Sequence, residues 1–310
     1  MKILITEFMD EAAVASLTGD FNTAYDAGLV DRHDEMLAKL SDVDALIVRN
    51  RTQVNAALLA AAPKLKVVGR LGVGLDNIDL PACKARGIEV IPATGANALA
   101  VAEYVIATAM MLLRGAYVSS AAVAAGQWPR GPLSNGREIG GKTLGIVGFG
   151  GIGRLAATLA QGLGMRVIGT DPMIDAAAAV WKESNVACRK LDELVAESDV
   201  VSLHVPLVPQ TRNLFDAARL AMMKTDAVLI NSSRGGIIDE AALAAALKAK
   251  RLGGAALDVF ADEPLKAGSP FVDCPNLILT PHIAGVTAES NTRVSSMIAE
   301  RVAAHLSAMR

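Results

Sequence analysis

The chain has 310 residues, which is enough for two domains that each bury a core of their own. Hydrophobic residues make up 52% of the chain and aromatic residues only 4%, so we expect an aliphatic, alanine-rich core of the kind found in helix-covered parallel sheets. The formal net charge of −2 provides no general attraction to nucleic acid or acidic lipid, and we expect neither as a partner.

The cysteines and the N-terminus indicate the compartment. Cys83, Cys188 and Cys274 stand singly, without the paired spacing of a disulfide framework or a metal site, so we expect reduced thiols and no bound metal. The opening MKILITEF turns acidic within the first ten residues and lacks a long apolar stretch, unlike a signal peptide. We therefore expect a cytoplasmic protein.

Residues 1–97 alternate short apolar runs with helical patterns. This alternation is typical of β-α units and a parallel sheet, in which ligand sites lie beyond the carboxyl ends of the strands. The predicted strands are Lys2–Thr6, Phe21–Tyr25, Ala45–Val48, Val67–Arg70 and Glu89–Ile91, and the predicted helices are Glu11–Leu17, His33–Leu40, Val54–Ala61 and Leu80–Arg86.

Two segments of this first half follow predicted strands and are candidates for binding an anion. Arg49-Asn50-Arg51-Thr52 comes directly after one strand, and Gly69–Gly74 ends another. The glycines at 72 and 74 let backbone N–H groups approach a ligand and form a nest, although a plain turn would also explain them. A solvated strand end is the structural alternative for the arginines.

Asn97–Arg114 is apolar on nearly every face, which predicts a helix packed between layers or between subunits. Glu103 and Arg114 make the stretch too short and too charged to span a bilayer. We place the crossover between the two domains here, and we expect residues 115–141 to form a surface loop that leads into the second domain.

The stretch TLGIVGFGGIGRLAATLAQGLGMRVIGTDP, residues 143–172, contains G-x-G-x-x-G at Gly148, Gly150 and Gly153. The glycines directly follow the apolar run Leu144–Val147 and open a helix whose free N–H groups would face a pyrophosphate. Asp171 ends the next strand, Arg166–Thr170, roughly 20 residues beyond the turn. A carboxylate there accepts hydrogen bonds from the adenosine ribose and repels a 2′-phosphate, which favours NAD over NADP.

The β-α alternation then continues to the end of the chain. The predicted strands are Asp199–His204, Ala227–Ile230, Ala255–Val259 and Leu277–Thr280, and the predicted helices are Leu191–Ala196, Phe215–Met223, Glu240–Lys250 and the tail from Thr287 to Arg310. The tail is expected to return to the first domain. This gives two doubly wound α/β domains with parallel sheets: a discontinuous flavodoxin-like substrate domain, residues 1–97 and 286–310, and a Rossmann NAD-binding domain, residues 98–285.

Arg234, Glu263 and His282 stand at the ends of three successive predicted strands, and so at the same sheet edge as the glycine turn. Oxidation of a 2-hydroxy acid needs a base for the hydroxyl proton, and an imidazole exchanges protons near neutral pH. Glu263 would fix the tautomer of His282, and Arg234 would bind a substrate carboxylate in a fork. Asp258 is placed to accept from the nicotinamide carboxamide. Each catalytic candidate also has a structural alternative when taken singly: His282 as a core or capping histidine, Glu263 as a surface acid and Arg234 as a surface ion-pair partner.

These segments resemble the D-isomer-specific 2-hydroxyacid dehydrogenase family, and most closely its 3-phosphoglycerate dehydrogenase-like branch. The matching stretches are GRLGVGLDNIDL, GFGGIGR with GTDP, HVPLVPQTRNLF, INSSRGGIIDE, AALDVFADEP and TPHIAG, which together span residues 69–285. The resemblance implies that Arg234, Glu263 and His282 are catalytic and that the backbone of Leu71, Gly72, Val73 and Gly74 holds the substrate carboxylate. It implies a homodimer interface at the helix from Asn97, and a cofactor site that includes Gly151, Ile152, Asp171, Pro206, Thr211, Ser233, Asp258 and Gly285.

The chain departs from the family where substrate is expected to bind. Phosphoglycerate dehydrogenases of this kind commonly have V-R-S-A-T-K-V where this chain has Val48-Arg49-Asn50-Arg51-Thr52-Gln53-Val54. We expect the added Arg51 to bind a second anionic group on the substrate, such as a phosphate, sulfonate or carboxylate. Ala93-Thr94-Gly95-Ala96 replaces the usual Thr-Pro-Asn-Gly, and with the chain ending at 310 we expect no serine feedback through a C-terminal regulatory domain.

The leading hypothesis is therefore an NAD-dependent oxidoreductase for a small 2-hydroxy acid such as 3-phosphoglycerate or sulfolactate. One alternative is a glyoxylate or hydroxypyruvate reductase, although such enzymes often prefer NADPH, which Asp171 disfavours. A formate dehydrogenase is weaker, since that branch has glutamine where Pro281 stands. A second alternative, from another class, is an NAD-sensing corepressor that binds peptides.

Overall fold

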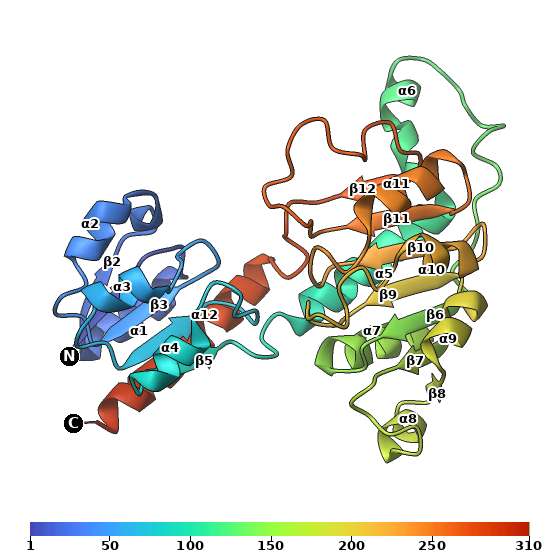
Figure 1. The fold of residues 1–310 in the computed structure, drawn as a ribbon. Coiled ribbons are helices and arrows are strands. Elements are labelled where there is room, and N and C mark those ends of the chain that lie inside the picture. The colour runs from blue at the N-terminus through green and yellow to red at the C-terminus, as the bar shows by residue number, and fades with distance from the viewer. Residues whose placement is uncertain (310) are drawn as a thin grey trace. The chain divides into compact units, whose positions relative to one another are not determined.

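The computed structural model describes residues 1–309, and the chain divides into two compact units. The first unit combines Met1–Asn97 with the chain from Val286 onward, and the second is Ala98–Gly285. In Figure 1 the first strand and the last long helix, α12 (Ala288–Ser307), belong to the same unit. The first unit is therefore built from both ends of the chain.

The first unit contains a sheet of five parallel strands in the order β2-β1-β3-β4-β5. This is the flavodoxin-like order, in which the chain reverses direction across the sheet between β1 and β3. Loops after these two strands border the crevice where such sheets bind ligands. The strands are β1 (Lys2–Ile5), β2 (Asn22–Tyr25), β3 (Ala45–Val48), β4 (Val67–Arg70) and β5 (Glu89–Pro92).

Helices cover both faces of this sheet. One face packs against α1 (Glu11–Asp20) and α12, and the other packs against α2 (His33–Ala38), α3 (Ala56–Ala61) and α4 (Leu80–Ala85). Side chains of Asp10, Asn55 and Asp79 accept from the first free N–H groups of α1, α3 and α4, which explains where these helices begin. A Cβ at Gly69 of β4 would lie 2.8 Å from Ile298 and Val302 of α12, so glycine lets that helix pack closely.

The second unit contains seven parallel strands in the order β12-β11-β10-β9-β6-β7-β8. Its switch point lies between β6 and β9, so the loops after these strands border the expected nucleotide crevice. The strands are β6 (Thr143–Val147), β7 (Arg166–Thr170), β8 (Ala187–Cys188), β9 (Val200–Leu203), β10 (Val228–Asn231), β11 (Gly254–Leu257) and β12 (Leu277–Leu279). The predicted fold class, two doubly wound parallel-sheet α/β domains, is confirmed.

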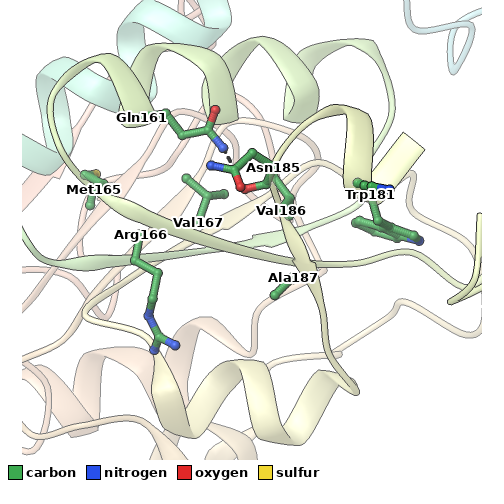
Figure 2. Close-up of a pocket in the computed structure, with 9 residues that line it drawn as sticks. Gln161, Met165, Arg166, Val167, Trp181, Asn185, Val186 and Ala187 are labelled. Carbon is green, nitrogen blue, oxygen red and sulfur yellow. Dashed lines mark hydrogen bonds between the residues drawn. The ribbon is translucent and has the colours of Figure 1, made fainter. Parts of the chain in front are cut away.

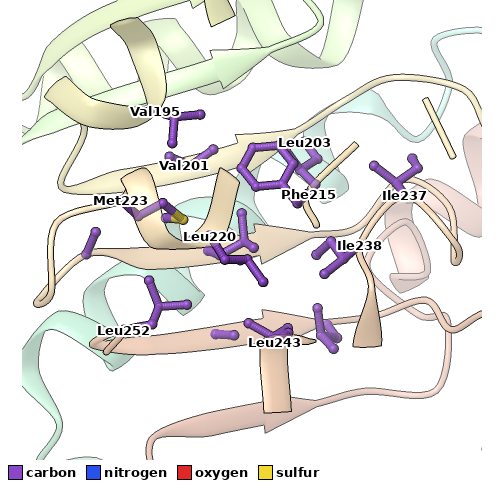
Figure 3. Packing of buried hydrophobic residues seen from close by; sticks show 14 of the residues in the cluster. Val195, Val201, Leu203, Phe215, Leu220, Met223, Ile237, Ile238, Leu243 and Leu252 are labelled. Carbon is purple, nitrogen blue, oxygen red and sulfur yellow. The ribbon is translucent and has the colours of Figure 1, made fainter. Parts of the chain in front are cut away.

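Two hydrophobic cores lie on the two faces of this second sheet. Figure 3 shows the one in which Phe215, Leu220 and Leu243 pack over the aliphatic face of the central strands. Its helices are α9 (Leu191–Glu197), α10 (Ala217–Met222) and α11 (Glu240–Lys248), and the opposite face carries α5 (Ala98–Arg114), α7 (Gly151–Gly162) and α8 (Ala179–Glu183). Both faces are covered, which explains why the strands are apolar throughout.

Several local predictions were wrong. Residues 115–141 are not all loop, since they contain η2 (Tyr117–Ser119) and α6 (Ser120–Ala124). The elements α8 and β8 were not predicted, because both are too short to show a period. Val54 and Phe215 begin predicted helices, but each forms an isolated β-bridge, with Ile78 and Ile238 respectively.

No single helix among residues 1–309 is long and apolar enough to cross a bilayer. Ala98–Arg114 and Tyr117–Ala124 reach that length and composition only as a pair, with a bend of 73° between them. Most of the apolar side chains of α5 are buried in the second unit. This agrees with the predicted buried helix.

Candidate active site

The glycine turn between β6 and α7 combines glycines that packing requires with glycines that face open space. Gly148 has φ +96°, and a Cβ there would lie 2.4 Å from the carbonyl oxygen of His204. A Cβ at Gly153 would lie 2.3 Å from the Gly148 carbonyl oxygen. Apart from the chain neighbours and the adjoining helix backbone, no atom of the described chain lies within 4 Å of the Cβ position of Gly150 or Gly151. The turn is therefore closed on its inner side and open on its outer side.

The open side coincides with the N-terminus of α7. Gly150 is the N-cap and supplies no side chain to accept the first N–H groups of the helix, which are the donors that an anion needs. An open backbone surface beside uncapped N–H groups fits the pyrophosphate of a dinucleotide. Ile152 is the second residue of this helix and is half-buried.

Asp171 follows β7 and is tied to the same turn. Its Oδ2 accepts from the Phe149 N–H at 2.8 Å, and its Oδ1 accepts from the Met173 N–H at 2.9 Å. The side chain is only half-buried. It is thus held beside the glycine turn and stays partly exposed, and each carboxylate oxygen can accept a second hydrogen bond, as recognition of an adenosine ribose requires.

The loops after β9 and β10 are fixed by their own side chains. Thr211 donates to the Pro206 carbonyl oxygen at 2.6 Å and accepts from the Val208 N–H at 2.8 Å. After β10, Ser233 donates from Oγ to Oδ1 of Asn231 at 2.8 Å, and the Asn231 amide donates to the Arg234 carbonyl oxygen at 2.8 Å. Both loops border the crevice at the carboxyl edge of the sheet.

The structure brings His282 and Glu263 into contact. Nδ1 of His282 lies 2.8 Å from Oε2 of Glu263, whose Oε1 accepts from the Phe260 N–H at 3.0 Å. An ionised carboxylate only accepts, so the Nδ1 position carries the hydrogen and Nε2 is left to exchange a proton with a ligand. The His282 side chain is 43% exposed, so a ligand has access to it. Arg234 follows β10. In the sheet, β11 separates β10 from β12, the strand that ends before His282.

Asp258, just after β11, is 1% exposed and organises the segment around His282. Its Oδ1 accepts from Thr280 Oγ1 at 2.6 Å and from the Ile283 N–H at 2.8 Å, and its Oδ2 accepts from the Ala284 N–H at 2.7 Å. Gly285 ends this segment and the second unit. The carboxylate thus has a structural role that the sequence did not predict, in addition to the predicted contact with the nicotinamide carboxamide.

In the first unit, the loop after β3 wraps around a buried acid, Glu7, which follows β1. Glu7 is 4% exposed, and its carboxylate accepts from the N–H groups of Arg49 at 2.8 Å, Thr52 at 3.0 Å and Arg51 at 3.1 Å. This buried carboxylate shapes the predicted anion-binding loop. Sequence reasoning missed it, although its place after the first strand was an available signal.

The two arginines of this loop differ. The Arg51 guanidinium pairs with Asp31 on the exposed surface. The Arg49 guanidinium is half-buried, donates to Oδ1 of Asn291 at 2.7 Å and lies 5.7 Å from the ring centroid of Phe8. Desolvation lowers the pKa of Arg49, and within residues 1–309 no carboxylate lies in salt-bridge range of its guanidinium.

The predicted nest at residues 71–74 has fewer backbone amides available to a ligand than expected. The Leu71 N–H donates to Val48 at 2.8 Å and the Gly72 N–H to Arg70 at 2.8 Å, so these two amides already serve the fold. Gly72 has φ +154°, and a Cβ there would collide with the Arg70 side chain. Val73, 37% exposed, and Gly74 retain the amides that could meet a ligand.

A separate pocket lies outside this region. Figure 2 shows it beside the start of β7, with a volume of about 410 Å³ and with Gln161, Arg166, Trp181 and Asn185 in its lining. Gln161 closes one side by donating to the Ser184 and Asn185 carbonyl oxygens. The start of a parallel strand lies at the edge opposite to the glycine turn, so this pocket is not part of the candidate active site.

Taken together, the second unit carries a doubly wound sheet, an open glycine turn and a histidine–carboxylate pair at one edge. This is the arrangement of a dinucleotide-dependent oxidoreductase, in which the cofactor crosses the switch point and an imidazole exchanges the substrate proton.

Comparison with known proteins assigns the family. Residues 106–284, more than half of the chain, match the model described as D-isomer specific 2-hydroxyacid dehydrogenase, NAD binding domain. The chain is 54% identical over 300 residues to an (S)-sulfolactate dehydrogenase of Chromohalobacter salexigens, covering 97% of this chain and 96% of that protein. The chain therefore belongs to the D-isomer specific 2-hydroxyacid dehydrogenase family, and the predicted NAD-dependent oxidoreductase class is confirmed.

Two further matches are informative. A D-3-phosphoglycerate dehydrogenase of Mycobacterium tuberculosis is 39% identical over 300 residues, which cover 97% of this chain but only 56% of that protein. Among solved structures, the TT0316 protein of Thermus thermophilus superimposes with a TM-score of 0.90 at 32% identity, covering 99% of this chain and 97% of that one. The predicted branch of the family is confirmed.

Proposed function

We propose that the chain interconverts a small dianionic 2-hydroxy acid and its 2-oxo acid with NAD, with sulfolactate as the first candidate and 3-phosphoglycerate as the second. The observation that carries the dianionic substrate is Arg49, a half-buried cation that forms no salt bridge in the described chain and lies at the switch point of the first sheet. The 54% identical relative, an (S)-sulfolactate dehydrogenase, supports the choice of a sulfonate.

His282 takes the hydroxyl proton of the substrate in oxidation and returns it in reduction. Glu263 holds Nδ1 and stabilises the imidazolium that forms. Arg234 binds the C1 carboxylate in a fork. The glycine turn and Asp171 would hold NAD, which would supply the acceptor for the hydride from C2.

The second unit, residues 98–285, is the NAD-binding domain of this proposal, and residues 1–97 with 286–310 are the substrate domain. Gly150 and Gly151 leave space for the pyrophosphate, and Asp171 selects NAD. Pro206, Thr211, Ser233, Asp258 and Gly285 border the rest of the cofactor, and Ile152 lies beside the phosphates.

We further propose a cytoplasmic homodimer. Leu99, Met110 and Met111 on α5 are each at least 40% exposed, as are Tyr117 and Val118 just beyond it. Several exposed apolar side chains along one helix and the turn after it are typical of a surface that another subunit covers.

The decisive experiment is a panel of 2-hydroxy acids in both enantiomers with NAD or NADP. We expect the highest kcat/KM for a sulfonate- or phosphate-bearing acid with NAD. Preference for glyoxylate or hydroxypyruvate with NADPH would favour the reductase alternative. Tight NAD binding without turnover of any acid would favour a corepressor-type binding protein.

A further inference from the structure

Hydroxyl groups link helix α5 to the acid that organises the His282 segment. The hydroxyl of Tyr104, on α5, lies 2.7 Å from Oγ1 of Thr280, and Oγ1 lies 2.6 Å from Oδ1 of Asp258. An ionised carboxylate only accepts, so Thr280 gives its hydrogen to Asp258 and must accept the hydrogen of Tyr104. The order of donation is fixed from Tyr104 through Thr280 to Asp258.

The far end of this relay holds the backbone of the catalytic segment. The His282 N–H donates to the Asp258 carbonyl oxygen at 2.8 Å, and the next two N–H groups donate to the two oxygens of the Asp258 carboxylate. His282 has φ +57°, a left-handed conformation that is unfavourable for a non-glycine residue. The conformation therefore depends on these hydrogen bonds.

We propose that Tyr104 is a positioning residue for His282, acting through Thr280 and Asp258. The proposal rests on the acid/base role of His282 proposed above. Donation from Tyr104 polarises the Thr280 hydroxyl toward Asp258, and members of a hydrogen-bonded chain strengthen one another. Without that donor, the Thr280 hydroxyl is free to turn away and Asp258 loses the contact that fixes one of its oxygens.

The hydroxyl of Tyr104 is a permanent member of the relay. Burial raises the pKa of Tyr104 to about 12, so the hydroxyl keeps its hydrogen at neutral pH. Its ring is partly buried and packs against the core beneath α5, which restricts its direction. The relay thus joins a rigid helix to the segment that carries His282.

The test uses the full-length enzyme with Tyr104→Phe, Thr280→Val and the double variant. Loss of one such hydrogen bond corresponds to a fall in kcat of about 3- to 10-fold. We expect that fall for each single variant, with KM for NAD changed less than about twofold. The double variant should be no slower than Thr280→Val, because Tyr104 acts only through Thr280. Thr280→Ser keeps the hydroxyl and should retain kcat.

Controls separate positioning from a general disturbance. Thr108→Val removes a buried hydroxyl from the same helix, where it donates to the Tyr104 and Val105 carbonyl oxygens, and leaves the two hydroxyls of the relay in place. It should leave kcat unchanged. An equal fall in Thr108→Val, additive effects in the double variant or an unchanged kcat in Tyr104→Phe would each overturn the proposal. His282→Asn tests the underlying role separately: turnover that survives this change would refute the acid/base assignment, whatever Tyr104→Phe does.

Discussion

Arg49 and Arg51 stand two positions apart on one loop, and their surroundings differ. Arg51 is 58% exposed at its side chain and already paired with Asp31, so a ligand would have to compete for it. The Arg49 guanidinium is desolvated, donates to the neutral amide of Asn291 and lies over the ring of Phe8, and the charge of Glu7 acts on it from beyond salt-bridge range. A desolvated guanidinium gains more from an incoming anion than an exposed, paired one. The structure therefore favours Arg49 as the residue that binds the second anionic group of the substrate, whereas the sequence alone favours Arg51.

The matched pair Arg49→Gln and Arg51→Gln tests this choice. A hydrogen bond to a charged group is worth about 1.5–3 kcal/mol, so Arg49→Gln should raise KM for a sulfonate- or phosphate-bearing acid at least tenfold. The KM for lactate, which lacks the second anion, should change much less. Arg51→Gln should leave both KM values within about twofold. If Arg51→Gln instead raises the KM for the dianionic acid and Arg49→Gln does not, Arg51 binds the second anionic group.

His204 carries a prediction about pH. Desolvation lowers its pKa from 6.5 to about 4, and its Nε2 lies 2.9 Å from the hydroxyl of Ser202. Between these two pH values the unfolded chain binds a proton that the folded chain does not, so the free energy of unfolding falls as pH drops below 6.5. The loss amounts to roughly 2 kcal/mol at pH 5.

The measurement is urea unfolding at pH 7 and pH 5, without cofactor, for the wild type and His204→Gln. The variant should lose roughly 2 kcal/mol less than the wild type on acidification, because glutamine does not titrate. Carboxylates with lowered pKa, such as Asp199, remain ionised over this range and contribute equally to both proteins. An identical pH dependence in the two proteins would refute the role of His204.

At the scale of elements, the glycine turn predicts two kinds of variant. Gly150→Ala adds a methyl group to open space at φ −74°, which alanine tolerates, so the free energy of unfolding should stay within about 0.5 kcal/mol of the wild type. The methyl group would occupy the pyrophosphate surface and weaken NAD binding. Gly153→Ala meets a backbone oxygen at 2.3 Å and should destabilise the fold by about 1–3 kcal/mol.

Calorimetry of NAD binding and chemical denaturation of both variants separate the two effects. Loss of stability in Gly150→Ala, or unimpaired NAD binding by it, would contradict the open surface as the phosphate site. Gly151→Ala serves as a second variant on the same open side.

The sequence predicts best the helices with a clear apolar period and the buried strands that lie between turn signals. Ala45–Val48, Val67–Arg70 and Arg166–Thr170 begin and end where predicted, because parallel strands buried on both faces are apolar throughout. The pairing of His282 with Glu263 also followed from order alone, since successive strands of a parallel sheet end at one edge.

What sequence could not predict depends on partners distant in the chain. Glu7 becomes a loop organiser only because β1 and β3 are neighbours in the sheet. Arg51 is occupied by Asp31, and Tyr104 is linked to Asp258 only through Thr280. Neither spacing nor composition encodes such contacts, so the loop geometry and the relay required the structure.

At the scale of the whole molecule, both tryptophans belong to the second unit. Trp128 is 79% exposed, whereas Trp181 is 4% exposed and stacks on Phe149 of the glycine turn at a centroid distance of 4.5 Å. Phe149 in turn donates its N–H to Asp171. Tryptophan emission therefore reports on residues 98–285 and on the region proposed to bind NAD, while far-ultraviolet ellipticity reports on the helices of both units.

This difference in probes gives a prediction for unfolding. Each unit has hydrophobic cores of its own, and NAD is proposed to bind the second. At 100 times its Kd, a ligand that binds only the folded form adds about 2.7 kcal/mol to the free energy of unfolding. NAD should move the unfolding transition seen by tryptophan emission to a higher urea concentration. Part of the transition seen by ellipticity should remain at the urea concentration found without NAD. NADP should shift emission less, because Asp171 repels its 2′-phosphate. If emission and ellipticity instead move together by the same amount, the two units unfold as one cooperative body and share the stabilisation by NAD.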